Sequence, residues 1–320
     1  MVTPSAIQRP APLVLLAAYQ GASFLPQQLD SLTHQTLPFR ALLRDDGSQD
    51  ATPSLLADIC RRDARFSLSP TSGKHLGVTN AFRALMQEAA TQACDVALCD
   101  QDDVWHPDKL ATLQAAMDEA EAHYGSATPL LVHSDGRVID AQGALLHASL
   151  MRHQGWDTRA TSLPELLMQT NVTGCMLMMN SALCRLAAAH MPDRDLHMHD
   201  WFIALTAAAF GQVISLSQPL VDYRQHGHNA MGASASGLWR RAAKALHSPE
   251  QAKRRIALSY RNAAQFLAAY KGLLPADKAA ILHDFVRIPT LPKPHRLLAL
   301  SRGGFRMQSR LARLGVLIFA

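Results

Sequence analysis

The sequence lacks the marks of several protein classes. Its 320 residues include five cysteines, an odd number, and none of them forms a CxxC pair. We therefore expect reduced thiols in the core of a cytosolic protein rather than a disulfide framework or a zinc site. No apolar run approaches the ~18–20 residues of a membrane-spanning helix. The N-terminal stretch has no basic segment and no cleavage site, so we expect no secretory signal.

Acidic residues are scarce in the C-terminal part of the chain. Residues 238–320 contain 16 Lys and Arg but only 3 Asp and Glu, whereas residues 1–237 contain 15 and 23. The 48% hydrophobic content allows a sizeable core. This split predicts a catalytic domain over residues 1–236 and a basic helical extension over residues 237–320, with a hinge at residues 234–237.

The basic extension has three possible roles. Basic and aliphatic residues alternate in it, as at residues 239–246, 253–258 and 305–319, which suits the surface of an anionic membrane. The alternative is a helical extension that packs on the catalytic domain with a solvated basic face. No aromatic interleaving or known motif supports nucleic acid as a partner. We expect a cytoplasmic protein that contacts the inner face of the membrane peripherally.

Short apolar runs alternate with helical spacing in the first hundred residues. The predicted strands are residues 12–18, 41–44, 66–68 and 96–99, and the predicted helices are residues 23–32, 52–62 and 78–93. Such alternation indicates an α/β fold with a parallel sheet covered by helices. Ligands bind such sheets beyond the carboxyl ends of the strands, which is where Tyr19, the Asp45-Asp46 pair and Asp100–Asp103 fall.

The second half of the chain is less regular. We predict strands at residues 130–132 and 138–139 around a turn at residues 134–136, and two more strands at residues 213–216 and 220–223. The predicted helices are residues 163–169, 181–190 and 202–210, and residues 174–179 form a very apolar run.

Three aspartates fall within four positions in the segment CDQDDVWHPDKL, residues 99–110. Asp100-x-Asp102 suits a hard divalent cation, which one or two carboxylates and substrate phosphates would hold. The same cation would stabilise a departing diphosphate. Alternatively, the loop is merely acidic and caps the helix after Pro107 through Asp103 or Asp108.

The segment Asp45-Asp46-Gly47-Ser48 also allows two interpretations. Asp-Gly is common in turns. The carboxylates could instead accept hydrogen bonds from a nucleobase and a ribose, and Tyr19 offers a flat face on which a base could stack.

Two later segments carry candidate chemistry. In His199-Asp200-Trp201, Asp200 is either a helix N-cap or a general base for an attacking hydroxyl, with His199 orienting it or purely structural. The segment from Tyr223 to Asn229 is rich in donors, and its Arg224, His226 and His228 suit phosphate recognition. The alternative there is a solvated loop, and zinc is disfavoured because no cysteine pair or carboxylate lies close in sequence.

These residues, in this order, resemble a known family. The segments are LLAAYQGASFLPQQLDSLTHQT, RDDGSQDAT, GKHLGVTNAFRAL, CDQDDVWHPDKL, VHSDGRVID, NVTGCMLMMN, HDWFIAL and YRQHGHNAMG. Together they are similar to the inverting family 2 glycosyltransferases with the GT-A fold, and most similar to the bacterial rhamnosyltransferase-like group. The resemblance covers roughly residues 12–233 and leaves the last 85 or so residues without a match.

The resemblance implies roles for the residues of the donor site. Tyr19 matches the residue that packs on the base, and Asp46 matches the carboxylate that binds the pyrimidine ring. Asp103 and Trp105 match the donor-sugar region. The loop that closes over the diphosphate is matched by Tyr223, Arg224 and His226.

The resemblance also implies the metal site and the base. Asp102 matches the principal ligand of Mg²⁺ or Mn²⁺, and Asp100 matches the acid on the ribose and metal side. Asp200 matches the catalytic base. Asp135 and residues 173–175 match segments near the donor sugar and the acceptor.

The implied activity is inverting transfer of a sugar, with rhamnose from dTDP-rhamnose as the best match. The implied acceptor is a hydroxyl of a cell-surface polysaccharide or a lipid-linked glycan. One alternative is a sugar-nucleotide nucleotidyltransferase, but a Gly-rich phosphate loop is absent where AAYQGASFL stands. The other is a non-catalytic binding homologue, which would not need Asp200.

Overall fold

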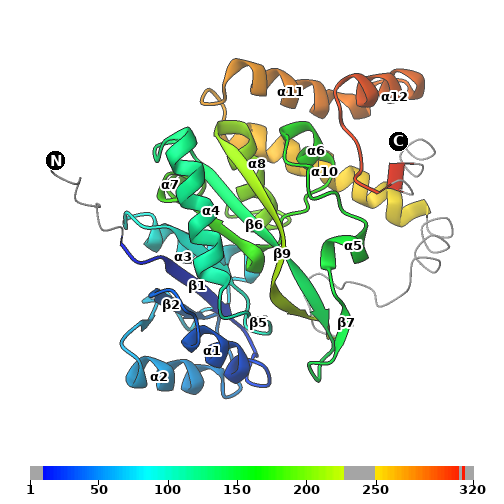
Figure 1. Cartoon of the computed structure of the whole chain (residues 1–320). Helices are drawn as coiled ribbons and strands as arrows, with labels where there is room; N and C mark the ends of the chain where they lie inside the picture. Colours follow the sequence, from blue (N-terminus) through cyan, green and yellow to red (C-terminus); the bar gives the residue numbers. More distant parts are fainter. Residues whose placement is uncertain (1–9, 227–248, 310–311, 314–320) are drawn as a thin grey trace, which may run out of the picture.

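One mixed sheet organises the molecule. The computed structural model of the protein describes residues 10–226, 249–309 and 312–313 (Figure 1). Its nine strands follow the order β3-β2-β1-β4-β8-β6-β9-β5, and β7 pairs with β6 outside that path. Helices flank the curled sheet, as the sequence predicts for an α/β protein.

The first half of the sheet is wholly parallel and confirms the predicted alternation. Its strands are β1 (Leu13–Ala18), β2 (Arg40–Asp45), β3 (Phe66–Leu68) and β4 (Val96–Cys99). The helices between them are α1 (Leu25–Thr33), α2 (Thr52–Arg62) and α3 (Val78–Ala89). Ala18 pairs with Asp45 and Leu16 with Cys99, so the carboxyl ends of three parallel strands meet at one edge.

The second half of the sheet is mixed. It comprises β5 (Val104–Trp105), β6 (Leu130–Ile139), β7 (Leu145–His147), β8 (Leu177–Met179) and β9 (Gln212–Arg224). Strand β8 runs antiparallel between β4 and β6, and β9 runs parallel to β6. Strand β6 therefore points the same way as β4, and its carboxyl half reaches the same edge.

Two predicted interruptions of the sheet are wrong. The predicted turn at residues 134–136 lies inside β6, and the two predicted strands at residues 213–216 and 220–223 are one strand, β9. The pairing shifts register on both sides of Asp135, which lies opposite Pro219. Bulges absorb the irregular residues and let the strands continue.

Two apolar cores lie on opposite faces of the sheet, since alternate residues of β1 belong to different cores. Val14 and Leu16 join the core under α1 and α4 (Lys109–Tyr124), whereas Leu13 and Leu15 join the core under α3. The helices α6 (Leu163–Met168), α7 (Ser181–His190) and α8 (His199–Phe210) complete this second core. The short helix α5 (Leu150–Gln154) packs beside β6, and a 3-10 turn, Gly174–Met176, leads into β8.

The C-terminal helices extend the second core. They are α10 (Pro249–Ala269), α11 (Ala276–Arg287) and α12 (Lys293–Arg302), with a 3-10 turn at Ile288–Thr290. Helix α10 packs beside α6 and α8, and α11 and α12 lie across the top of the view in Figure 1. Phe266 and Tyr270 are fully buried, and Tyr270 Oη lies 3.0 Å from Thr206 Oγ1 of α8. The apolar face of this part of the extension is thus occupied by the protein itself, as the packing alternative expects.

Some predictions concern residues outside the described ranges. These are the hinge at residues 234–237, the basic stretch at residues 239–246 and the apolar end at residues 314–319. The domain boundary at residue 236 stays a prediction. Among the described helices, none combines the length and apolar character that crossing a bilayer requires.

Candidate active site

The loop after β4 is fastened to the end of β1. Gln101 accepts a hydrogen bond from the backbone amide of Tyr19 at 2.7 Å and donates one to its carbonyl at 2.9 Å. A Cβ atom at position 21 would collide with the Gln101 side chain, so this approach requires Gly21. These two hydrogen bonds hold the loop of aspartates beside Tyr19, the candidate residue for stacking on the base. The sequence patterns did not single out Gln101.

The end of β9 is hydrogen-bonded to the same loop. The backbone amide of Arg224 donates to Asp103 Oδ1 at 3.0 Å, and its Nε donates to the carbonyl of Asp102 at 2.8 Å. Further donors of Arg224 bind Gln27 and the carbonyls of Asp140 and Ala141. This guanidinium is buried and hydrogen-bonded to the protein. In this structure it therefore stabilises the loop and is not exposed to a phosphate ligand.

His226 engages the aspartate that the sequence singles out for a metal. Its Nε2 lies 2.7 Å from Asp102 Oδ2, and its ring stacks on Phe24 with centroids 4.7 Å apart. Both side chains are mostly buried. Since one oxygen of Asp102 is already occupied, a cation would have to share it with His226 or displace the ring.

The structure instead groups Asp103 with Asp100. One ligand atom from each of Asp100, Asp103 and Cys175 lies within 4.8 Å of the others. Oδ2 of Asp103 is buried without a hydrogen bond to any residue in the described ranges. Two carboxylates with a free oxygen fit a hard cation such as Mg²⁺ or Mn²⁺, whereas a thiol does not favour one.

The electrostatics of this group favour a cation. Burial, with the neighbouring charges of Asp103, Asp102 and Asp200, raises the pKa of Asp100 well above its usual range. Burial and Asp102 raise the pKa of Asp103 to about 7. Carboxylates crowded in this way are costly to ionise alone, and a bound cation would remove that cost.

A buried lysine lies beneath the aspartates. Lys109 Nζ donates to the carbonyl of Cys175 at 2.5 Å and lies 3.0 Å from the ring centroid of Trp105. Burial lowers the pKa of Lys109 to about 7. Trp105 is only 2% exposed, and its ring packs on Lys109 beneath the loop, while its assignment to the donor-sugar region stays a prediction.

Asp200 lies in the first turn of α8, where Met198 and not Asp200 is the N-cap residue. Its Oδ1 accepts from the amide of Trp201 at 2.7 Å, and its Oδ2 accepts from the amide of Gly174 at 3.1 Å. Burial outweighs these hydrogen bonds and raises the pKa of Asp200 to about 6. A carboxylate with such a pKa suits a general base near neutral pH.

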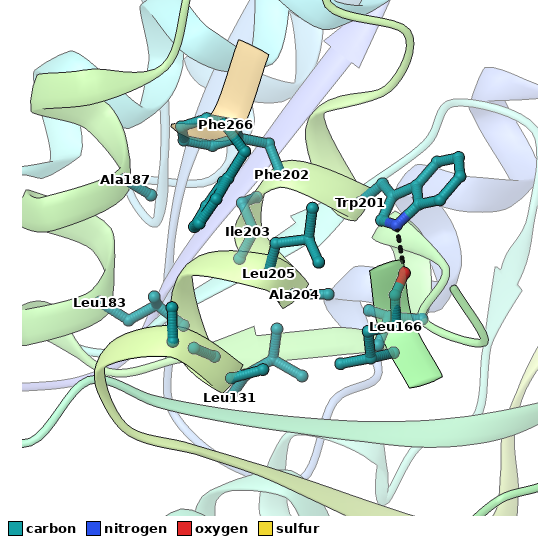
Figure 2. Close-up of a cluster of buried hydrophobic side chains, with 14 of the residues drawn as sticks. Leu131, Leu166, Leu183, Ala187, Trp201, Phe202, Ile203, Ala204, Leu205 and Phe266 are labelled. Atoms are coloured by element: carbon teal, nitrogen blue, oxygen red, sulfur yellow. Dashed lines mark hydrogen bonds between the residues drawn. The ribbon is translucent and has the colours of Figure 1, made fainter. Parts of the chain in front are cut away.

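The packing of α8 fixes the position of Asp200. Trp201 Nε1 donates to the carbonyl of Leu166 in α6 at 2.7 Å, and the following residues pack into the core with Phe266 (Figure 2). His199, beside Asp200, stacks on Phe82 at 4.3 Å and is buried. Burial lowers the pKa of His199 to about 3, so its ring is neutral, and it makes no hydrogen bond to Asp200.

The nucleotide end of the edge contains Tyr19 and Asp46. Tyr19 is 44% exposed, and its ring centroid lies 4.3 Å from that of His75. Asp46 is buried and accepts from the amides of Leu76 and Gly77 and from Arg44. This carboxylate therefore organises the loop after β3, and a base would have to compete for its oxygens.

Tyr223 lies on β9 beside the aspartates. Burial, with the charges of Asp103 and Asp100, raises the pKa of its phenol, which is partly exposed. Tyr19, Asp46, Asp100–Asp103, Asp200 and Tyr223–His226 thus all belong to one edge of the sheet. His228 lies outside the described residues.

The model of one protein family matches this chain. The match is to "Glycosyl transferase family 2" and covers residues 13–184, which is more than half of the chain and includes β1 to β4 and the aspartate loop. The chain belongs to glycosyl transferase family 2. Asp200 and the end of β9 lie beyond the matched residues.

The curated relatives of this family 2 chain have low sequence identity to it. "dTDP-rhamnosyl transferase RfbG" of Shigella flexneri is 23% identical over 228 residues, or 69% of this chain and 75% of the relative. The uncharacterized protein Rv1520 of Mycobacterium tuberculosis is 24% identical over 234 residues. That match spans 72% of this chain but only 60% of the length of the mycobacterial protein.

Solved structures confirm the GT-A fold of this family 2 protein. Residues 1–349 of S. aureus TarS in complex with UDP superpose with a TM-score of 0.54 at 13% identity, covering 89% of this chain and 73% of TarS. The complex of TarS with UDP-GlcNAc gives the same TM-score at 14% identity and covers 97% and 89%.

Proposed function

We propose that the protein is an inverting glycosyltransferase that uses a nucleotide-diphospho-sugar donor. One observation carries the proposal. Asp200, a buried base with a raised pKa, lies close enough to the aspartate cluster that its charge contributes to the raised pKa of Asp100. A proton acceptor and a diphosphate site side by side are what transfer from a nucleoside diphosphate to a hydroxyl requires.

The reaction would be a single displacement. Asp200 takes the proton of an acceptor hydroxyl while that oxygen forms a bond to the anomeric carbon. The bond from that carbon to the diphosphate oxygen breaks, its electron pair leaves with the nucleoside diphosphate, and the configuration inverts. The amide of Gly174 and the anchored start of α8 hold the Asp200 carboxylate in place throughout.

A divalent cation, Mg²⁺ or Mn²⁺, would neutralise the charge that develops on the diphosphate. Asp100 and Asp103 would hold it, because Asp103 Oδ2 is free whereas Asp102 is hydrogen-bonded to His226. This assignment modifies the sequence-based choice of Asp102 with Asp100. Asp102 and His226 would then link the cation site to the end of β9.

The donor we propose carries a pyrimidine nucleotide, with dTDP-rhamnose as the leading candidate. The relative from Shigella flexneri is named for a dTDP-rhamnosyl transfer, and the TarS complexes contain UDP or UDP-GlcNAc. Tyr19 offers an exposed ring on which the base would stack. The acceptor would be a hydroxyl of a cell-surface polysaccharide or of a lipid-linked glycan.

Replacing Asp200 tests this proposal. Asp200→Asn keeps the shape of the side chain and removes the base, so turnover should fall about 10²–10⁴-fold while donor affinity stays unchanged. Turnover is measured as nucleoside diphosphate release from dTDP- and UDP-sugars in the presence of bacterial glycans, and affinity by calorimetry. Near-full turnover in Asp200→Asn would contradict the assignment of the base.

We also propose that the basic extension contacts an anionic membrane through charge rather than insertion. The apolar side of α10 is buried in the protein, while Lys253, Arg254 and Arg255 are exposed. Each such residue adds about 1 kcal/mol near an anionic surface. The fraction of protein that floats with phosphatidylserine vesicles should fall when these three residues are changed to Gln. The control variant, Arg61→Gln with Arg62→Gln on α2, should float like the wild type. Equal flotation of both variants and the wild type would contradict the proposal.

A further inference from the structure

Two adjoining cavities lie beside strands β6 and β9. They have volumes of about 500 and 480 Å³ and share Asp135, Ser149, Arg152 and Ser217. β6, β9 and α5 form one side, and Gln308 from the C-terminal extension forms part of the other. The region lies near β7 and α5 on the right of Figure 1. Strand β6 points the same way as β4, so Asp135 belongs to the edge that carries Asp100.

Among the Asp and Arg side chains that line these cavities, Arg152 is the one without a partner in the described part of the chain. Asp157 forms an ion pair with Arg159 at 3.3 Å. Asp135 is buried and accepts from Ser149 Oγ and from the amides of Gly136 and Met151. The guanidinium of Arg152, which borders both cavities, makes no hydrogen bond or ion pair within the described ranges of the chain. Arg152 is therefore a positive charge open to a ligand.

The first cavity also contains an aromatic wall. Trp156 is partly buried against the core and lines the cavity, with its indole N–H unbonded in the described structure. Sugar rings carry apolar C–H faces that pack on an indole, and its N–H can reach a hydroxyl. An open guanidinium beside it binds carboxylate or phosphate oxygens with two parallel hydrogen bonds. This combination fits an acidic saccharide.

The cavity is tied to the candidate base by a short segment. Asn171 Nδ2 donates to the carbonyl of Asp157 at 2.8 Å, and three residues later the amide of Gly174 donates to Asp200 Oδ2. Three residues span at most about 11 Å. Gln308 bonds both Gln169 and the amide of Asp157, so the extension fixes this wall. One short segment thus links the wall of the first cavity to the residue that holds Asp200.

We propose that these cavities bind the acceptor and select a saccharide with an anionic group, either a uronate carboxylate or a phosphate. Arg152 binds the anion and Trp156 packs on a sugar ring. The inference rests on the proposed function, because it identifies the substrate class on the acceptor side of the same site.

The test measures binding of the full chain to an array of oligosaccharides in matched neutral, uronate-bearing and phosphate-bearing forms. Wild type should prefer the acidic members. Arg152→Gln should weaken binding of acidic members about tenfold and leave neutral members unchanged, since a hydrogen bond to a charged group contributes about that much. Trp156→Ala should weaken both kinds. Arg61→Gln, at an exposed position of helix α2, is the matched control and should change binding of neither kind.

Donor binding, measured by calorimetry with dTDP and UDP on the same variants, separates the two proposals. Both cavity variants should bind the donor nucleotide like the wild type. Preference for uronate or for phosphate members would identify the source of the anion. Wild type without an acidic preference, or acidic binding that survives Arg152→Gln, would overturn the inference even where donor binding is intact. Failure of wild type to bind either nucleotide would instead count against the proposed function.

Discussion

Asp200 has a raised pKa because it is buried, despite two hydrogen bonds that act in the opposite direction. The amides of Trp201 and Gly174 stabilise the carboxylate, yet burial moves its pKa from 3.8 to about 6. At neutral pH the group is ionised but only weakly stabilised as an anion. It can therefore accept a proton in the reaction, which an exposed aspartate does poorly.

This pKa predicts the pH dependence of catalysis. Only the ionised form of Asp200 can take the acceptor proton, so kcat/KM should fall about tenfold per pH unit below a midpoint near pH 6. Donor affinity is measured over the same pH range. A change in donor affinity reports the ionisation of Asp103, whereas a change in rate alone reports that of Asp200. A midpoint near pH 4, or no fall at all, would contradict the role of Asp200.

At the scale of single residues, the sequence predicted which side chains lie close together but not which hydrogen bonds each of them makes. The position of Asp100–Asp103 after a parallel strand was enough to predict their place. The engagement of Asp46 by the amides of Leu76 and Gly77, and of Arg224 by carbonyls, depends on loops that no periodicity describes. The burial of Trp105 was unpredictable for a similar reason, since the sequence does not reveal that Lys109 lies against its ring.

At the level of elements, helix α8, which carries Asp200, is buried on all sides. Residues 199–209 are all buried, which is typical of a helix inside a core rather than on its surface. Trp201 joins the start of this helix to α6 through its indole N–H (Figure 2). The orientation of Asp200 thus depends on its neighbour.

Trp201→Phe tests this dependence. The change leaves the carbonyl of Leu166 without its donor, so the free energy of unfolding should fall by about 1–3 kcal/mol. Because the start of α8 loses its anchor, kcat should fall while donor affinity is kept. Denaturant unfolding and steady-state kinetics give the two values. A stable variant with unchanged kcat would show that other contacts position Asp200.

Regular elements were predictable and irregular ones were not. The alternation of strand and helix in the first hundred residues gave each of the first four strands nearly to the residue. Gly136 and Pro219 are residues that normally interrupt a strand, so β6 and β9 were each divided in the prediction. Only pairing between these two strands, with bulges beside Asp135, makes each continuous.

At the scale of the whole molecule, the C-terminal helices share a core with the helix that carries the candidate base. Ile256, Phe266, Tyr270 and Phe285 belong to the same core as Phe202 of α8. The net charge of the extension suggested a surface role, but charge alone does not reveal what the interleaved aliphatic residues cover. In the structure they cover the helix that bears Asp200.

Phe266→Ala should therefore destabilise the entire protein. Phe266 is fully buried and lies edge-on to Phe202 with centroids 5.4 Å apart, so its loss should cost about 3–5 kcal/mol. Leu298→Ala, at a position 46% exposed in the same extension, should change stability by less than about 0.5 kcal/mol. Unfolding in denaturant measures both. A neutral Phe266→Ala would indicate that the extension is not part of this core.

Calorimetric binding of donors to the full chain tests the central claim, which is a cation-dependent nucleoside diphosphate site at the carboxyl edge of the sheet. UDP, dTDP, GDP and their sugars are titrated with Mn²⁺ and with a chelator, on wild type, Asp103→Asn and Asp102→Asn. We predict pyrimidine-selective binding that requires Mn²⁺, is lost in Asp103→Asn and is weakened less in Asp102→Asn. Absence of binding to every pyrimidine donor, or equal binding with the chelator, would contradict it.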